Sequence, residues 1–100
     1  SRQLMLVNYA AKTEGRDALE QRIQQDEHDL DARFDYAICL IVDHETDEGI
    51  DQLFHILEKN MDYKDGAARE MVMSMVSSLK QNEPELARTI QQRLSNLTHG

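Results

Sequence analysis

The segment ARFDYAICLIVDHETDEGIDQLFHIL, residues 32–57, decides the fold, because it reads as two helices joined by a short polar turn. Apolar residues recur at intervals of three and four on both sides of the turn, which is the spacing of an amphipathic helix. We predict the first helix over about 30–43 and the second over about 47–60. The first helix is apolar on two sides, so it should pack between neighbours or line a groove.

Acidic residues crowd the turn, in the stretch VDHETDEGIDQLF at 42–54. A calcium loop of the EF-hand type needs oxygen ligands at loop positions 1, 3 and 5, a glycine at position 6 and a glutamate at position 12. Asp43, Glu45 and Asp47 match the first three positions. The glycine comes one residue late, at Gly49, and the twelfth position holds no glutamate. The pattern therefore fails where calcium geometry is strictest.

A helix start explains most of the same residues. Thr46 can cap the second helix, and Asp47 and Glu48 complement the positive end of its dipole. Asp43 and Glu45 remain as surplus charge that the sequence does not explain.

Helical periodicity continues through the rest of the chain, which has one proline and four glycines in 100 residues. Further helices are predicted over about 3–12, 17–26, 67–79 and 84–97, and Pro84 fits the first turn of the last one. The predicted fold is all-α, a right-handed stack of antiparallel helix hairpins with about six helices. We expect one domain over residues 1–100.

The chain is acidic, with 19 Asp and Glu against 11 Lys and Arg and a formal charge of −8. Phosphate binding depends on Lys and Arg, so this balance opposes nucleic acid and anionic membranes as partners. No apolar run approaches the roughly 20 residues that cross a bilayer. Ten of the acidic residues lie between Asp26 and Asp51, with Arg33 as the one base. They form either a solvated face or a patch that steers a basic partner.

Catalytic chemistry has little support in the sequence. Cys39 is the single cysteine, so no internal disulfide or CxxC motif exists, and its place in YAICLIV favours a buried thiol. The histidines lack the spacing of a helical zinc pair, and there is no glycine-rich phosphate loop. We expect no enzyme and no cofactor. The alternatives are a small acidic protein that binds Ca²⁺ or Mg²⁺, and an acidic decoy of a basic partner.

The two helices of residues 32–57 resemble one tetratricopeptide repeat. Tyr36, Ala37 and Leu40 lie on the first helix, and Gly49 and Leu53 follow the polar turn. In such repeats, small residues like Ala37 and Gly49 fall where the two helices approach most closely.

Residues from about 18 to 97 resemble the C-terminal helical region of bacterial thioredoxin-like co-chaperones, also called chaperedoxins. The resemblance is carried by the acidic linker, the DEGIDQLF helix and the link LEKNMDYKDGAAR at 57–69. It implies a non-catalytic, cytoplasmic module that binds unfolded client proteins or a chaperonin, in protein folding and cell redox homeostasis. The first residues show neither an initiator Met nor a signal peptide, so we expect the C-terminal part of a longer thioredoxin-like protein.

The resemblance also implies a partner-binding surface on the first helix of the hairpin. That surface maps onto Phe34, Ile38 and Val42. The alternative for these three residues is burial against the preceding helix.

An apolar stretch near the N-terminus suggests a second contact. Its residues are Leu4, Met5, Leu6 and Val7. A repeat stack buries apolar faces between neighbours, so an end left uncovered favours a homodimer of this chain.

Overall fold

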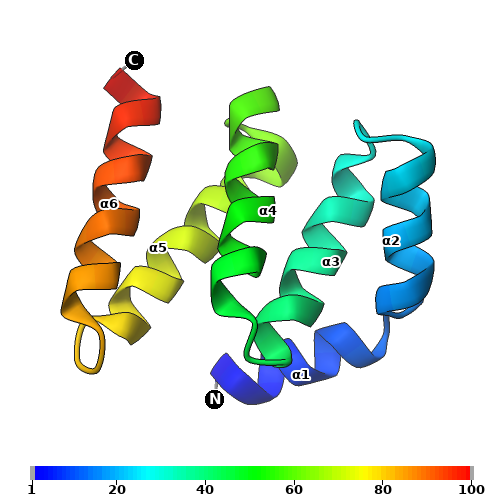
Figure 1. Cartoon of the computed structure of the whole chain (residues 1–100), viewed down its shortest axis with the longest axis horizontal. Coiled ribbons are helices and arrows are strands. Elements are labelled where there is room, and N and C mark those ends of the chain that lie inside the picture. The colour runs from blue at the N-terminus through cyan, green and yellow to red at the C-terminus, as the bar shows by residue number, and fades with distance from the viewer. Residues whose placement is uncertain (1, 100) are drawn as a thin grey trace. The chain divides into compact units, whose positions relative to one another are not determined.

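The computed structural model describes residues 2–99, with side chains described over residues 3–98, and within that range it contains six α-helices, one short 3-10 helix and no strand. The elements are α1 (Arg2–Ala11), α2 (Arg16–Gln25), α3 (Leu30–Val42), α4 (Thr46–Lys59), η1 (Tyr63–Gly66), α5 (Ala67–Leu79) and α6 (Pro84–His99). The all-α prediction is confirmed, and the predicted helix ends differ from the observed ones by two residues or fewer. Figure 1 shows the helices in chain order.

Residue contacts divide the chain into two compact units, unit 1 over residues 1–56 and unit 2 over residues 57–100. The boundary falls within α4. Each unit is described by itself below, and the single domain predicted over residues 1–100 stays a prediction.

Unit 1 is organised around α3. The helix α2 lies alongside α3, α1 packs across it, and α4 returns antiparallel to it after a short turn (Figure 1). Nine of the thirteen residues of α3 are buried, from Ala32 to Ile41. A helix with this much buried surface must be apolar on more than one side, as its sequence predicts.

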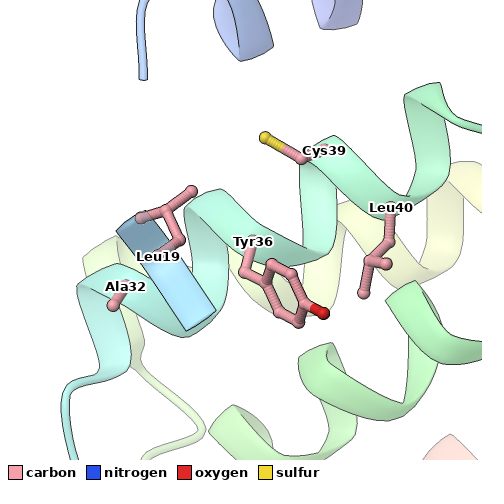
Figure 2. Close-up of a cluster of buried hydrophobic side chains, with 5 residues drawn as sticks. All are labelled: Leu19, Ala32, Tyr36, Cys39 and Leu40. Carbon is pink, nitrogen blue, oxygen red and sulfur yellow. The ribbon is translucent and has the colours of Figure 1, made fainter. Parts of the chain in front are cut away.

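A cluster of buried side chains joins α2 to α3 (Figure 2). Leu19 enters it from α2, and the members from α3 are Ala32, Tyr36, Cys39 and Leu40. Leu19 is fully buried and is the one buried residue of α2. Cys39 is also buried, with its Sγ 3.6 Å from Thr13 Oγ1, which confirms the predicted buried thiol. These contacts anchor α2 on α3 through a narrow stripe.

The turn between α3 and α4 closes through His44. The amide of His44 donates to the Ile41 carbonyl (3.1 Å), and the amide of Glu45 donates to the Leu40 carbonyl (2.8 Å). This is the hydrogen-bond pattern of a Schellman motif, in which a left-handed residue follows the helix. His44 has a φ of 67° and occupies that left-handed position. A residue with a Cβ therefore stands where glycine is most favourable.

His44→Gly should stabilise the chain. Relief of the left-handed strain, less the extra entropy of glycine in the unfolded chain, is expected to raise the free energy of unfolding by about 0.5–1 kcal/mol. Urea unfolding followed by circular dichroism measures this change. His28 does not have a positive φ, so His28→Gly is the matched control and should lower stability slightly. Equal effects of the two substitutions would contradict the assignment.

The start of α4 corrects one prediction. The helix begins at Thr46, and the Glu45 carbonyl accepts from the Gly49 amide (3.1 Å), so Glu45 rather than Thr46 holds the capping position. Asp47 and Glu48 lie in the first turn, as predicted. The turn covers residues 43–45 rather than the predicted 44–46, because the Schellman motif ends directly at Glu45.

Gly49 marks the closest approach of α3 and α4. A Cβ placed on Gly49 would lie 2.8 Å from Ile41 Cγ1 and 3.0 Å from the Ala37 carbonyl oxygen. Both distances are shorter than ordinary van der Waals contact. The prediction that Ala37 and Gly49 bring the two helices together is confirmed.

A single carboxylate starts α3 and ties it to α2. Asp29 caps the helix by accepting from the Ala32 amide (3.1 Å), and it also accepts from Arg22 Nε (3.2 Å) and Nη2 (3.0 Å). The bond from the Ala32 amide and the Arg22 guanidinium both lower the pKa of Asp29. Arg22 also pairs with Glu14. This arginine of α2 therefore contacts both the turn that precedes α2 and the start of α3.

Arg33 is the one buried charged residue among the described side chains. Its Nε donates to the Glu27 carbonyl (2.8 Å) and its Nη1 to Gln52 Oε1 (2.7 Å). Both acceptors are neutral, and they fix the turn before α3 and the middle of α4 to the same side chain. A buried charge is tolerated because its donors are satisfied.

Unit 2 is built on the hairpin of α5 and α6, which run antiparallel (Figure 1). Its buried side chains include Val72, Met75 and Val76 on α5 and Ala87 and Ile90 on α6. Pro84 begins α6, as predicted.

The segment between α4 and α5 contains a left-handed turn. Lys64, Asp65 and Gly66 have consecutive φ values of 47°, 58° and 90°, and Tyr63 beside them is buried. Two of the three residues carry a Cβ, so the segment holds an uncommon backbone conformation.

Candidate protein-interaction surface

The three residues predicted to bind a partner lie on α3, and two of them are buried in the core of unit 1. Phe34 is 6% exposed and Ile38 is 1% exposed, whereas Val42 is half-buried. Phe34 and Ile38 therefore contribute mainly to the core of unit 1. Partner binding by the three residues stays a prediction, and Val42 offers the accessible surface.

Tyr9 on α1 covers Phe34. Their rings meet edge to face, with centroids 6.2 Å apart and an interplanar angle of 88°. This is a favoured aromatic geometry. Ala10, the next residue, packs against the cluster of Leu19 and its neighbours. Tyr9 thus covers Phe34, one of the three residues that were predicted to form a binding surface.

The outer side of α1 carries large apolar side chains. Leu4 is 59% exposed, Met5 71%, Val7 47% and Tyr9 37%. We call Leu4, Met5 and Val7 the α1 outer face; Tyr9, which also contacts Phe34 and Asp35 on α3, lies at its edge. Leu6, which the sequence grouped with Leu4, Met5 and Val7, is half-buried instead. Between Gln3 and Ala11 the helix has no charged residue.

Two carboxylates border the α1 outer face at Tyr9. The Tyr9 hydroxyl donates to Asp35 Oδ1 at 2.7 Å, and Asp31 precedes Asp35 by one turn of α3. Partial burial, the bond to Asp35 and the negative charges of Asp35 and Asp31 raise the pKa of Tyr9 to about 12. The apolar surface of α1 therefore ends at an acidic edge.

The ionisation of Tyr9 gives a pH test of this geometry. Because the pKa is raised from 10.0 to about 12 in the folded chain, the stability that this group contributes is fully present below pH 10 and is lost as the pH rises toward 12. Tyrosinate absorbance should show a late transition that Tyr9→Phe removes and Asp35→Asn shifts to lower pH. Ionisation of Tyr9 near pH 10 would contradict the hydrogen bond.

Asp43 and Glu45, the acidic residues of the turn between α3 and α4, form ion pairs with an arginine of α2. Arg16 Nη1 lies 3.0 Å from Asp43 Oδ2 and also pairs with Glu45 Oε2. The Arg16 guanidinium stacks above the Tyr36 ring, 5.9 Å from its centroid. The Tyr36 hydroxyl donates to Glu20 Oε1 (2.8 Å). Asp43 and Glu45 thus hold the start of α2 against the turn, and this role accounts for the charge that the sequence left unexplained.

The net charge belongs entirely to unit 1. Residues 1–56 contain 13 acidic and five basic residues, for a formal charge of −8, whereas residues 57–100 contain six of each. Three of the five bases, Arg16, Arg22 and Arg33, are engaged in the contacts described above. The surface of unit 1 is therefore acidic.

Metal-ligand groups and membrane-spanning helices were sought in the described part of the chain. Over residues 2–99, no group of three or more His, Cys, Asp and Glu residues is placed to hold a metal ion. None of the helices in the same range is long and apolar enough to span a membrane.

The sequence missed two features of this surface. It grouped Leu4, Met5, Leu6 and Val7 as an uncovered apolar end and gave Tyr9 no role. The four-residue spacing of Met5 and Tyr9 was the available signal for an outer face. The pairing of Arg16 with the turn had no local signal, because the partners are 27 and 29 residues apart.

The helix hairpins agree with the comparison of this chain with known families. A family model described as tetratricopeptide repeat matches residues 9–99. No curated protein and no solved structure matches the chain. The match covers α2 to α6 and most of the described chain, and it confirms the resemblance of residues 32–57 to such a repeat. The chain therefore belongs to the tetratricopeptide repeat family.

Proposed function

We propose that this chain is the non-catalytic protein-interaction module of a bacterial, cytoplasmic, thioredoxin-like co-chaperone. It would hold unfolded or oxidised client proteins and pass them to a chaperonin. The observation that carries the proposal is the tetratricopeptide repeat match over residues 9–99, because repeats of this family serve as protein-binding modules. The resemblance of residues 57–69 to the corresponding link in chaperedoxins supports the more specific role.

The chemistry of the chain is consistent with an adaptor. Its single thiol, Cys39, is buried in the core of unit 1. A buried thiol in apolar surroundings is a poor nucleophile. Redox chemistry in such a co-chaperone would then belong to a thioredoxin domain outside this chain.

An aggregation assay tests the client-holding role. A reduced, chemically unfolded enzyme is diluted with and without a molar excess of the 100-residue chain, and light scattering is recorded. The chain should lower the scattering and should co-sediment with a purified chaperonin. Unchanged scattering together with no co-sedimentation would overturn the proposal.

Val42 is the most accessible of the three predicted partner-binding residues, so it is the one to substitute in this assay. Val42→Ser changes a half-buried side chain at the end of α3, and it should weaken the suppression of aggregation if this surface holds clients. The matched control is Met73→Ser, which changes a 55% exposed side chain on α5. Equal activity of both variants would remove Val42 from the binding surface.

A further inference from the structure

The α1 outer face combines two properties that point to one kind of partner. Leu4, Met5 and Val7 expose apolar surface on a helix without charged residues between Gln3 and Ala11. The inner side of the same helix already packs on the core through Ala10. Both sides of α1 are thus suited to packing, and the outer side is exposed in this chain.

Two aspartates of α3 place negative charge at the edge of the α1 outer face. Asp31 and Asp35 are four residues apart on α3, so their carboxylates lie on the same side of that helix. Asp35 is positioned at the face by its 2.7 Å bond from the Tyr9 hydroxyl. A cation approaching along the outer face would meet both carboxylates at its end.

The negative charge of unit 1 favours a basic partner protein on the α1 outer face. With a formal charge of −8 over residues 1–56, two copies that pair through α1 bring like charges together. An acidic partner meets the same repulsion. A basic partner gains from both the apolar strip and the acidic edge.

We infer that the α1 outer face, together with Asp31 and Asp35, binds a basic amphipathic helix of a partner protein. The apolar stripe of that helix would pack on Leu4, Met5 and Val7, and its Lys or Arg residues would reach the two carboxylates. Helix against helix is the natural geometry, because a row of side chains on one helix fits between the rows of another. The inference rests only on the protein-binding part of the proposed function, and the co-chaperone role does not enter it.

A synthetic peptide titration tests the inference on the intact 100-residue chain. The probe is a labelled 18-residue peptide of Leu and Lys, ordered so that all Leu residues fall on one helical face. Peptides of the same composition in scrambled order, and of Leu and Glu, serve as comparisons. Fluorescence anisotropy should show saturable binding of the Leu–Lys helix, weakening with salt, and much weaker binding of the other two peptides.

Substitutions locate the site. Leu4→Ser combined with Met5→Ser should weaken binding by more than about tenfold, because these are the two most exposed side chains of the face and Leu4 lies at its middle. Asp31→Asn combined with Asp35→Asn should weaken it several-fold and flatten its salt dependence. Met73→Ser and Glu58→Gln change an exposed methionine and an acidic residue of unit 2, and both should leave affinity unchanged.

Three results would overturn the inference. The first is equal binding of the scrambled peptide, and the second is binding that the Leu4 and Met5 substitutions leave unchanged. The third is a dimer in sedimentation that these substitutions dissociate, with no binding of the Leu–Lys helix, which would assign the face to a second copy. The titration contains no unfolded client and no chaperonin, so its failure is distinguishable from failure of the proposed function.

Discussion

Replacing Leu19 by alanine should lower the free energy of unfolding by about 3–4 kcal/mol, the usual cost of removing a fully buried leucine. Leu19 is 0% exposed and is the one residue through which α2 enters the core cluster (Figure 2). The cavity would lie between α2 and α3, so α2 should detach first. Hydrogen exchange of amides 16–25 would then rise toward unfolded rates while α3 stays protected.

Urea unfolding followed by circular dichroism gives the size of this effect. Ile23→Ala is the matched control on the same helix, because Ile23 is partly buried beside the same cluster. It should cost clearly less, about 1 kcal/mol, in proportion to the smaller area that it removes from water. Equal losses at Leu19 and Ile23 would contradict the view that a narrow stripe holds α2 in place.

Gly49→Leu should cost about 3 kcal/mol, at the upper end of the range for overpacking a tight contact. A Cβ at this position would already meet Ile41 Cγ1 at 2.8 Å and the Ala37 carbonyl oxygen at 3.0 Å. The carbonyl belongs to the backbone of α3 and cannot rotate away. The two helices of the hairpin would have to separate, which exposes the contact that defines the repeat.

Two further variants separate crowding from a general effect of leucine. Glu48→Leu places the same side chain one residue earlier, at an exposed position, and should change stability little. Ile41→Ala removes Cγ1, so Gly49→Leu should cost less in that background than alone, and the double-mutant cycle measures the coupling. Additive effects of Ile41→Ala and Gly49→Leu would contradict the close approach of Ile41 to position 49.

Much of the fold could be predicted because its determinants are local. Apolar residues at intervals of three and four set the helices, Pro84 sets the start of α6, and the acidic pair Asp47 and Glu48 marks the first turn of α4. The close approach at Gly49 was also predicted, from the resemblance of residues 32–57 to a tetratricopeptide repeat, in which small residues lie where the two helices meet.

The remaining features depend on contacts between distant residues. The pairing of Arg16 with Asp43 and Glu45 joins positions that only the folded chain brings together. Tyr9 meets Phe34 in the same way, so periodicity could mark Phe34 as apolar but could not say which helix would cover it. The left-handed His44 was missed because the sequence rule expects glycine there.

Hydrogen exchange with and without a client shows whether this chain binds other proteins through its repeat helices. The 100-residue chain is mixed with a saturating amount of a reduced, unfolded protein, and exchange is compared with that of the chain alone and of the chain with the same protein in its native form. We expect slower exchange on the helices of unit 1 with the unfolded protein and no change with the native one. Identical exchange in all three samples would contradict it.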